Sequence, residues 1–230
     1  MQRMLDTITA EVAYTAPMTG RAALAPRVMA AMARVPRHAF VDPDQRDQAY
    51  ANHPLPIGHG QTISQPYMVA LMTDLLDPRP HQRVLEVGCG SGYQAAILAQ
   101  LVARVVSLEI IPALAASARA RLARLGYRNI AVECADGSRG WPPEAPYHGI
   151  LVAAAAPEIP PALIEQLAPG GHLIIPLGAP WHGQQLIDLH KDHHGDLTQR
   201  ALLAVSFVPL TGASPPPSSP GGGDGQAHDP

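Results

Sequence analysis

A glycine-rich segment, EVGCGSGYQ at residues 86–94, carries the first pattern in this sequence that predicts chemistry. Gly88, Gly90 and Gly92 recur at every second position directly after an apolar run. This arrangement is typical of the strand-to-helix turn that contacts a nucleoside or a phosphate in open α/β sheets. The dinucleotide-binding fingerprint G-x-G-x-x-G fails, because its sixth position is Tyr93. The turn therefore predicts contacts to a nucleoside and disfavours a ligand held through a pyrophosphate.

Acidic residues stand near the ends of successive expected strands around this turn. Glu86 precedes the glycines, where we expect its carboxylate to face a cationic ligand. Glu109 lies about 20 residues further on, where a carboxylate accepts both hydroxyls of a ribose. Asp136, followed by Gly137, is expected to face an adenine amino group. Each acid alone is more typical of a solvated loop, but their combined placement favours an adenosine that carries a positive charge. S-adenosylmethionine has a cationic sulfonium and no phosphate, so the pattern predicts a methyltransferase that uses it as cofactor.

The elements that must position these residues follow a regular order. Short apolar strands alternate with amphipathic helices from residue 83 onward, which is typical of a parallel sheet covered on both faces. The last strands are joined by the turn HHGD and predict an antiparallel hairpin. We therefore expect an α/β, Rossmann-like methyltransferase fold with a mostly parallel sheet and a C-terminal hairpin. The expected strands are 83–88, 104–110, 129–134, 149–156, 172–178, 184–192 and 197–210, and the expected helices are 27–35, 93–101, 112–126 and 161–171.

Length and composition bound the domain organisation. The chain has 230 residues, of which 47% are hydrophobic and 15% charged, enough for one sizeable core. We expect a single methyltransferase domain over 1–212, with a helical cap over about 1–60 and a Rossmann-like core over about 66–212. Residues 213–230 are rich in Pro, Gly and Ser and have no aliphatic side chain larger than alanine. They are expected to form a disordered tail.

Charge and cysteine usage exclude several classes of function. The net charge of -3 and the pI near 6.4 give no basic surface of the kind that nucleic acids require. No apolar run approaches membrane-spanning length and the first residues lack the layout of an export signal, so we expect a cytoplasmic monomer without nucleic-acid or membrane partners. Cys89 and Cys134 predict neither a disulfide framework nor a zinc site. We also expect a solvated turn rather than a metal site at His190, His193 and His194.

A second loop, IGHGQTISQPYM at 57–68, lies directly ahead of an apolar helical pattern. The longer segment PLPIGHGQTISQPYMVALM, with VPRHAFV upstream and VSFVPLTG near the end, closely resembles the protein-L-isoaspartate O-methyltransferase family. The resemblance covers nearly all of 21–212, and the T-I-S-x-P block is specific to that family. It implies an enzyme that methylates the free carboxylate of L-isoaspartyl residues in aged proteins. The ester then collapses to a succinimide that reopens partly to normal aspartate.

The chemistry of such a reaction explains the composition of the loop. A carboxylate with a pKa near 4 is already ionised at neutral pH, so a general base has nothing to contribute. Alignment of oxygen, methyl and sulfur remains, and positioning supplies about 7–11 kcal/mol. We expect small donors here: the hydroxyls of Thr62 and Ser64, and backbone N–H groups beside the glycines. Pro66 then begins a helix that is expected to anchor the loop. Its expected buried stripe is Val69, Met72, Leu75 and Leu76.

Ser64 matches the functional serine of the family, and the resemblance implies that it donates a hydrogen bond to the methyl-accepting carboxylate. It also implies that Ile63 and Ser64 contact the cofactor. From the residues alone, a helix cap is the favoured interpretation of Ser64, because it stands two residues before Pro66, and the match to the T-I-S-x-P block favours the functional role instead. An extended peptide bound mainly through its backbone fits substrates of unrelated sequence. The residues expected to border that peptide are Ile57, Thr62, Ile63, Ser64, Val208 and Pro209, although the apolar ones are also typical of a core.

Some positions depart from the family pattern, and other functions stay open. His148 and Gly149 stand where Asp and Ala are usual, and Ala154 belongs to VAAA in place of VTAA. We expect these changes to leave catalysis intact. The arginines of ARARLARL are expected on the solvent face of their helix. The alternatives are a carboxyl methyltransferase for a dedicated biosynthetic peptide and a catalytically silent cofactor-binding module.

Overall fold

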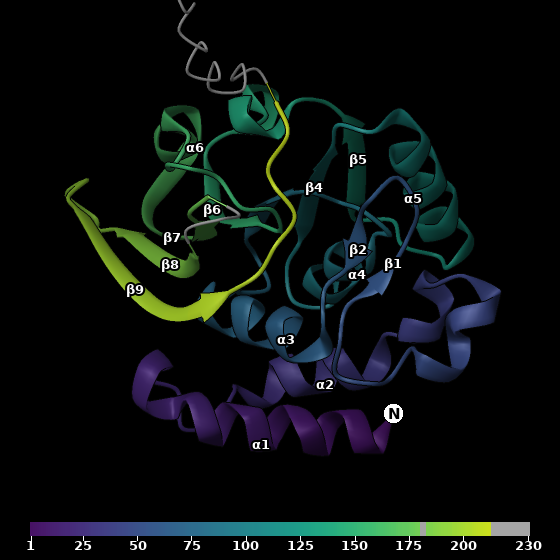
Figure 1. Ribbon diagram of the computed structural model, residues 1–230. Coiled ribbons are helices and arrows are strands. Elements are labelled where there is room, and N and C mark those ends of the chain that lie inside the picture. Colours follow the sequence, from purple (N-terminus) through teal and green to yellow (C-terminus); the bar gives the residue numbers. More distant parts are fainter. Residues whose placement is uncertain (180–182, 213–230) are drawn as a thin grey trace, which may run out of the picture.

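A twisted seven-stranded sheet forms the centre of the molecule, as the computed structural model of residues 1–179 and 183–212 shows (Figure 1). The strand order is β5-β4-β3-β6-β7-β8-β9. All pairs from β5 to β7 are parallel, whereas β7–β8 and β8–β9 are antiparallel. The predicted fold class is therefore confirmed, and the predicted tail lies outside the described residues. The strands are β3 (Arg83–Val87), β4 (Arg104–Glu109), β5 (Ile130–Cys134), β6 (Tyr147–Val152), β7 (Leu167–Leu177), β8 (Gln184–Lys191) and β9 (Leu197–Val205).

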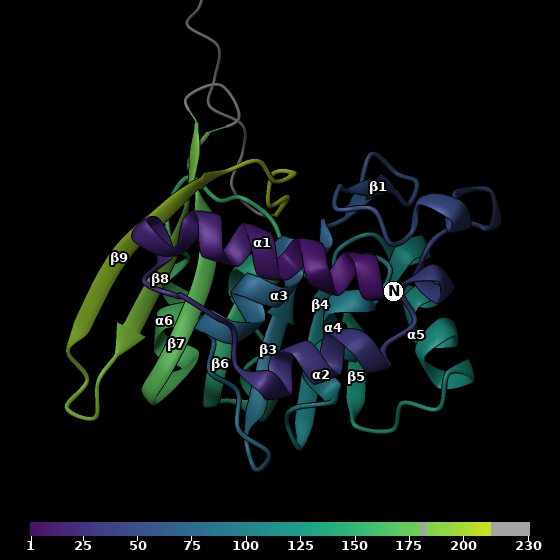
Figure 2. The ribbon, with the colours of Figure 1, turned by 90° about the horizontal axis from the view of Figure 1, so that it is seen from below.

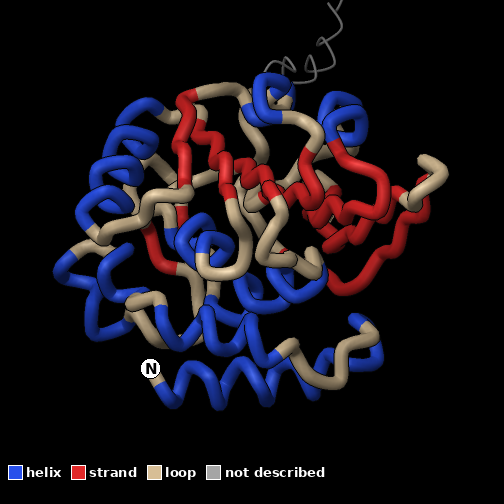
Figure 3. Tube along the Cα trace, turned by 180° about the vertical axis from the view of Figure 1, so that it is seen from behind, coloured by secondary structure: helices blue, strands red, loops and turns tan. Residues whose placement is uncertain are grey.

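Helices cover both faces of the sheet (Figure 3). Successive strand residues point to opposite faces, so Val84 joins one buried cluster and Leu85 the other. The larger cluster lies on one side of the sheet and contains residues of five helices: α1 (Gln2–Thr19), α2 (Pro26–Arg34), α3 (Pro66–Leu75), α4 (Tyr93–Ala99) and α5 (Pro112–Arg124). The smaller cluster includes α6 (Pro161–Gln166) on the other face. Because both faces are buried, the central strands are apolar on both sides.

The chain reverses its direction of travel across the sheet between β3 and β6. From β3 it moves outward to β4 and β5, and it then returns to place β6 on the other side of β3. A crevice forms outside the carboxyl ends of the strands at such a switch point, and ligands of open α/β sheets bind there. The fold therefore places the glycine turn that follows β3 next to the residues that follow β6.

The N-terminal helices form a second layer outside α3. The buried residues of α1 recur at helical spacing along one face, and Figure 2 shows this helix running across α3 towards β9. Thr15 of α1 and Tyr67 of α3 share a hydrogen bond of 2.6 Å between their hydroxyls. All ten residues of α3 are buried, so the expectation of a single buried stripe is wrong. The reason is that α3 is sandwiched between the sheet and this outer layer.

Several boundaries differ from the sequence expectations. Helix α6 ends at Gln166 and not near residue 171, because Pro169 has no N–H to donate and restricts the residue before it. Strand β9 ends at Val205 and not at residue 210, and the residues that follow leave β8 and form a bridge between Pro209 and Ala155, just beyond β6. The segment expected as a plain loop contains a small antiparallel ladder of β1 (Leu55–Pro56) and β2 (Thr62–Ile63).

A buried carboxylate joins the outer helices to α3 and gives a test of this packing. Asp74 is 5% exposed and accepts a hydrogen bond of 2.7 Å from the backbone N–H of Ala25, at the start of α2. Asp74→Ala leaves that N–H without its partner, so we expect the free energy of unfolding to fall by about 1–3 kcal/mol in urea titrations. Asp77→Asn is the matched control, since Asp77 is 42% exposed and its ion pairs are solvated. A loss for Asp77→Asn as large as that for Asp74→Ala contradicts this account.

Candidate active site

The glycine turn after β3 is held by hydrogen bonds to the neighbouring strand. The backbone N–H groups of Gly88 and Cys89 both donate to the carbonyl of Leu108, each at 2.9 Å. Gly88, Gly90 and Gly92 have φ angles of 91°, 53° and 87°, in the left-handed region that glycine adopts without strain. The turn can therefore follow a path that exposes backbone atoms to the crevice at the switch point.

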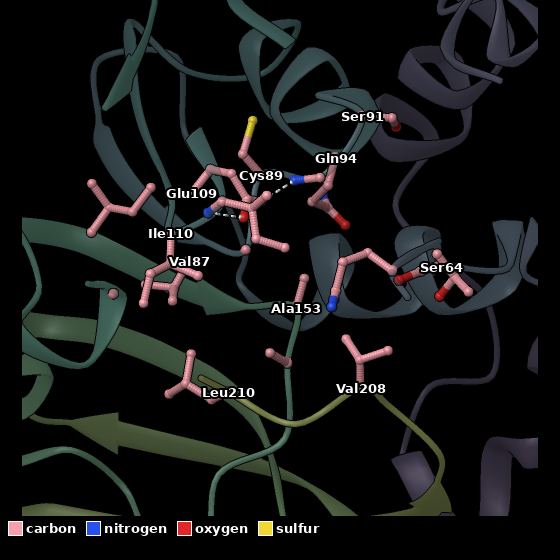
Figure 4. Close-up of a pocket in the computed structure, with 18 of the residues that line it drawn as sticks. Ser64, Val87, Cys89, Ser91, Gln94, Glu109, Ile110, Ala153, Val208 and Leu210 are labelled. Atoms are coloured by element: carbon pink, nitrogen blue, oxygen red, sulfur yellow. Dashed lines mark hydrogen bonds between the residues drawn. The ribbon is translucent and has the colours of Figure 1, made fainter. Parts of the chain in front are cut away.

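Glu109, at the end of β4, fixes the middle of this turn. One carboxylate oxygen accepts from the N–H of Gly90 at 2.8 Å, and the other accepts from the N–H of Ile111 at 3.0 Å (Figure 4). Each oxygen of a carboxylate has more than one acceptor site, so both keep capacity for a ligand hydroxyl. Glu109 thus supports the turn and offers acceptors to the cavity beside it.

A segment that follows β9 closes the opposite side of the crevice. It bonds to the chain just beyond β6, where the N–H of Ala155 donates to the Val208 carbonyl at 2.8 Å and the N–H of Leu210 donates to the Ala155 carbonyl at 2.7 Å. The buried side chain of Gln184 holds Phe207 by accepting from its N–H at 2.6 Å and donating to its carbonyl at 3.0 Å. These bonds place Val208 and Pro209 over the carboxyl ends of the central strands.

The loop at 57–64 forms a tight turn rather than an open cradle. Gly58, His59 and Gly60 all have positive φ angles, and no atom lies within 4 Å of a Cβ built at either glycine. These glycines allow the chain to turn between β1 and β2, and the expectation that they also let the backbone approach a ligand stays a prediction. Ile57 packs on the glycine turn, where a Cβ at Gly90 would lie 3.1 Å from its Cδ1.

Ser64 does not cap the helix that follows it. The N-cap position of α3 is Gln65, which makes no side-chain capping bond, and the side chain of Asn52 accepts from the N–H of Tyr67 at 3.0 Å. Asn52 thus satisfies a donor at the helix start from a distant part of the chain. Ser64 is half-buried and belongs to the lining of the cavity described below (Figure 4).

A cavity lies between these segments, with Ser64 and Glu109 on opposite sides and Ala153 between them (Figure 4). Glu109 is the one charged residue that lines it in the described part of the chain, and neither lysine nor arginine does so there. This lining suits a ligand with hydroxyls and positive charge and disfavours a phosphate. The predicted contact residues that line the cavity are Thr62, Ile63, Ser64, Gly88, Gly90, Glu109, Gly137, Val208 and Pro209.

A larger groove of about 790 Å³ adjoins the cavity. Thr62, Ser64, Ala153 and Val208 line both spaces, so the groove opens directly onto the cavity. One wall belongs to α1 and the other to residues 203–208. The arrangement provides a smaller cavity beside the glycine turn and a larger groove next to it, with Ser64 at their junction.

Four predicted contact residues do not line either space. Glu86 is fully buried beneath the turn, where the hydroxyl of Ser107 donates to it, so its expected orientation towards a cation needs correction. Gly92 is the N-cap of α4 and packs on Leu122. Asp136 accepts from the N–H of Ser138 at 3.0 Å and caps a short 3-10 helix. Ile57 covers the glycine turn, as described above.

Sequence reasoning also missed residues that the structure places at the site. Gln94 lines the cavity and donates to the Thr73 hydroxyl at 2.9 Å, and a polar residue within an apolar helical pattern was its one signal. Arg119 and Arg124 are exposed as expected, whereas Arg121 is half-buried and donates to the Ser91 carbonyl at 2.8 Å, so it is only partly on the solvent face. Nothing in the sequence indicates the role of Asn52, which depends on a contact between segments 15 residues apart.

An open, mostly parallel sheet with a glycine turn, an acid at the end of the second strand and a cavity free of basic residues defines a Rossmann-like methyltransferase dependent on S-adenosylmethionine. Residues 18–215 match the family model described as protein-L-isoaspartate(D-aspartate) O-methyltransferase. The chain belongs to this family.

Individual relatives support the assignment over most of the chain. Protein-L-isoaspartate O-methyltransferase 2 of Polaromonas sp. is 56% identical over 209 residues, which cover 91% of this chain and 99% of that protein. The protein of the same name from Syntrophobacter fumaroxidans is 56% identical over 210 residues, covering 91% and 85% of the two chains. The crystal structure of a beta-aspartate methyltransferase from Plasmodium falciparum, in complex with S-adenosyl-L-homocysteine, is 25% identical and superposes with a TM-score of 0.74, covering 91% and 97%.

The buried carboxyl of Glu86 gives the site a testable pH dependence. Burial raises the pKa of Glu86 to about 8, because the charged form loses its hydration, although the bond from Ser107 opposes this. The unfolded chain therefore releases this proton at lower pH than the folded one. The contribution to stability is complete below the unfolded pKa and is lost as the pH rises towards about 8, by at most about 1.4 kcal/mol per pH unit.

We expect Glu86→Gln to flatten the dependence of the free energy of unfolding on pH between 5 and 8, because an amide does not titrate. Urea titrations at several pH values measure this slope. Glu165→Gln, at an exposed position on α6, is the matched control and should keep the wild-type slope. Identical slopes for wild type and Glu86→Gln contradict the assignment of a buried neutral carboxyl.

Proposed function

We propose that the protein transfers a methyl group from S-adenosylmethionine to the free carboxylate of L-isoaspartyl residues in damaged proteins and peptides. Membership of the family, with relatives 56% identical over 91% of the chain, supports this activity. The observation that carries it in the structure is the position of Ser64, which lines both the cavity beside the glycine turn and the adjoining groove. The reaction is the first step of a repair, since the methyl ester can close to a succinimide that reopens partly to aspartate.

The residues around the cavity fit the cofactor. Backbone groups at Gly88 and Gly90 face a ligand without a side chain in the way, and Glu109 offers carboxylate oxygens to ribose hydroxyls. Ile63 and Gly137 complete the predicted contacts that line the cavity. When bound, the cofactor supplies an electrophilic methyl group on a positively charged sulfur. Glu86, Gly92 and Asp136 do not line the cavity, so they would support the backbone around the bound cofactor and would not contact the cofactor through the cavity.

The protein's part in catalysis is to position the acceptor. The acceptor carboxylate is already a nucleophile at neutral pH, so no side chain needs to remove a proton. The hydroxyl of Ser64 donates to one acceptor oxygen and holds the other in line with the methyl group. Thr62 and Val208 border the same junction and restrict the approach of the peptide. Alignment of this kind converts binding free energy into rate.

We also propose that the protein acts as a cytoplasmic monomer without nucleic-acid or membrane partners. The net charge of -3 supports protein rather than nucleic-acid substrates. Both cysteines are free, Cys89 buried and Cys134 exposed, which fits a reducing compartment. Burial also raises the pKa of the Cys89 thiol well above its usual range, which disfavours oxidation at the turn. Among the described residues, no helix combines the length and apolarity needed to span a membrane.

The activity is tested with two peptides that differ only in aspartate or L-isoaspartate at one position. We expect incorporation of labelled methyl from S-adenosylmethionine into the isoaspartyl peptide alone. The label should be lost on mild base treatment, because a methyl ester forms. Equal labelling of both peptides would falsify the repair function and favour a carboxyl methyltransferase of other specificity. Binding of S-adenosylhomocysteine without any labelling would leave a silent cofactor-binding module.

Ser64→Ala separates positioning of the acceptor from binding of the cofactor. Loss of a hydrogen bond to a charged group costs about 1.5–3 kcal/mol, so we expect kcat to fall about 10- to 100-fold. The Kd of S-adenosylhomocysteine, measured by calorimetry, should change less than about threefold. Ser117→Ala, at an exposed position on α5, is the control. A weakened Kd with unchanged kcat would mean that Ser64 serves the cofactor and not the acceptor.

A further inference from the structure

The side of the groove that α1 lines differs from the other sides because it carries a charged side chain. Glu11, Tyr14 and Thr15 line the groove from this helix, at spacings of three and four residues that place them on one helix face. Residues 1–17 of the chain lie outside the region matched by the family model.

Glu11 is the one charged side chain that lines the groove in the described part of the chain. It is half-buried, and none of the ion pairs among the described residues involves it. Thr15, one turn further along, is occupied by its bond to Tyr67. A carboxylate that is partly removed from water and lacks a cationic partner favours a cation brought in by a ligand.

Tyr14 adds a second feature that favours a cation. Its side chain is 78% exposed, although aromatic residues of this size are usually packed against other residues. The face of an aromatic ring attracts a lysine ammonium or an arginine guanidinium. Because Tyr14 and Glu11 stand one helical turn apart on the groove face, one basic side chain can contact both.

We propose that this face of α1 selects isoaspartyl substrates with a lysine or arginine close to the methyl-accepting residue. The proposal rests on the function given above, since the groove is taken as the peptide site. The acceptor must lie at the junction beside Ser64, and the groove that leaves this junction is bounded by α1 on one side and by residues 203–208 on the other. The peptide that flanks the acceptor therefore passes Glu11 and Tyr14.

A peptide series tests this selection directly. Each peptide carries one isoaspartyl residue and either lysine or norleucine at a single position, from three residues before it to three after. The measured quantity is the ratio of kcat/KM for the lysine peptide to that for the norleucine peptide. At low ionic strength we expect a ratio of about three to ten at one or two positions, which falls as salt screens the charges.

Variants of α1 assign the selection to its residues. Glu11→Gln should lower the lysine-to-norleucine ratio by at least about threefold, and Tyr14→Leu should lower it while Tyr14→Phe keeps it. Asp6→Asn removes the same charge from an exposed position of the same helix that does not line the groove, and it should keep the wild-type ratio. Circular dichroism of each variant confirms that α1 is retained.

The outcomes separate this inference from the proposed function. A ratio near one at every position, or an unchanged ratio in Glu11→Gln, overturns the inference and leaves isoaspartyl methylation in place. An equal fall of the ratio in Glu11→Gln and Asp6→Asn also overturns it, since net charge then explains the preference. If no isoaspartyl peptide is labelled at all, the proposed function fails and the selection fails with it.

Discussion

The hydrogen bond from the Gly90 N–H to the carboxylate of Glu109 is the interaction on which the site depends. The turn that contains Gly90 follows β3, whereas Glu109 ends β4, so the bond forms only when the two strands pair in register, with Val87 opposite Leu108. The same register brings the Leu108 carbonyl to the N–H groups of Gly88 and Cys89. A pairing error of one residue would turn the carboxylate to the other face of the sheet and leave the turn unsupported.

The other walls of the site are held by the same kind of bond, from a side chain to a backbone group. Gln184 holds Phe207 and so positions the segment after β9, and Asn52 holds Tyr67 and so positions the loop before α3. Such bonds are directional and join segments that no strand pairing connects. A buried backbone N–H or C=O group without a hydrogen-bond partner lowers the stability of the fold, so each of these bonds also avoids that loss of free energy. The site is thus built from loops, and hydrogen bonds from side chains elsewhere in the fold hold these loops in place.

The fold could be predicted from the sequence because its strands are short apolar runs at regular spacing. The periodicity of hydrophobic residues indicates such elements directly. The glycine turn and Glu109 were found for the same reason, since both stand at fixed offsets from strand ends. The orientation of Glu86 was not predictable, because a strand residue points to one face or the other according to a register that only pairing decides. The hydrogen bond from Arg121 to the Ser91 carbonyl was not predictable either. A long arginine side chain on a polar helix face can reach the backbone of a neighbouring turn, and the sequence does not show whether it does so.

The small number of charges near Ser64 is consistent with the proposed chemistry. An anionic carboxylate and a cationic methyl donor neutralise each other as the methyl moves, so the transition state carries less charge than the reactants. A lysine of the enzyme at this junction, in direct contact with the acceptor carboxylate, would stabilise the reactants more than the transition state and would raise the barrier. The junction is instead bordered by Ala153 and Val208, with the hydroxyl-bearing side chains of Thr62 and Ser64 beside them. Because Asn52 satisfies the helix donor that a serine in this position often satisfies, Ser64 is not needed as a helix cap, which fits the proposed hydrogen bond to the acceptor.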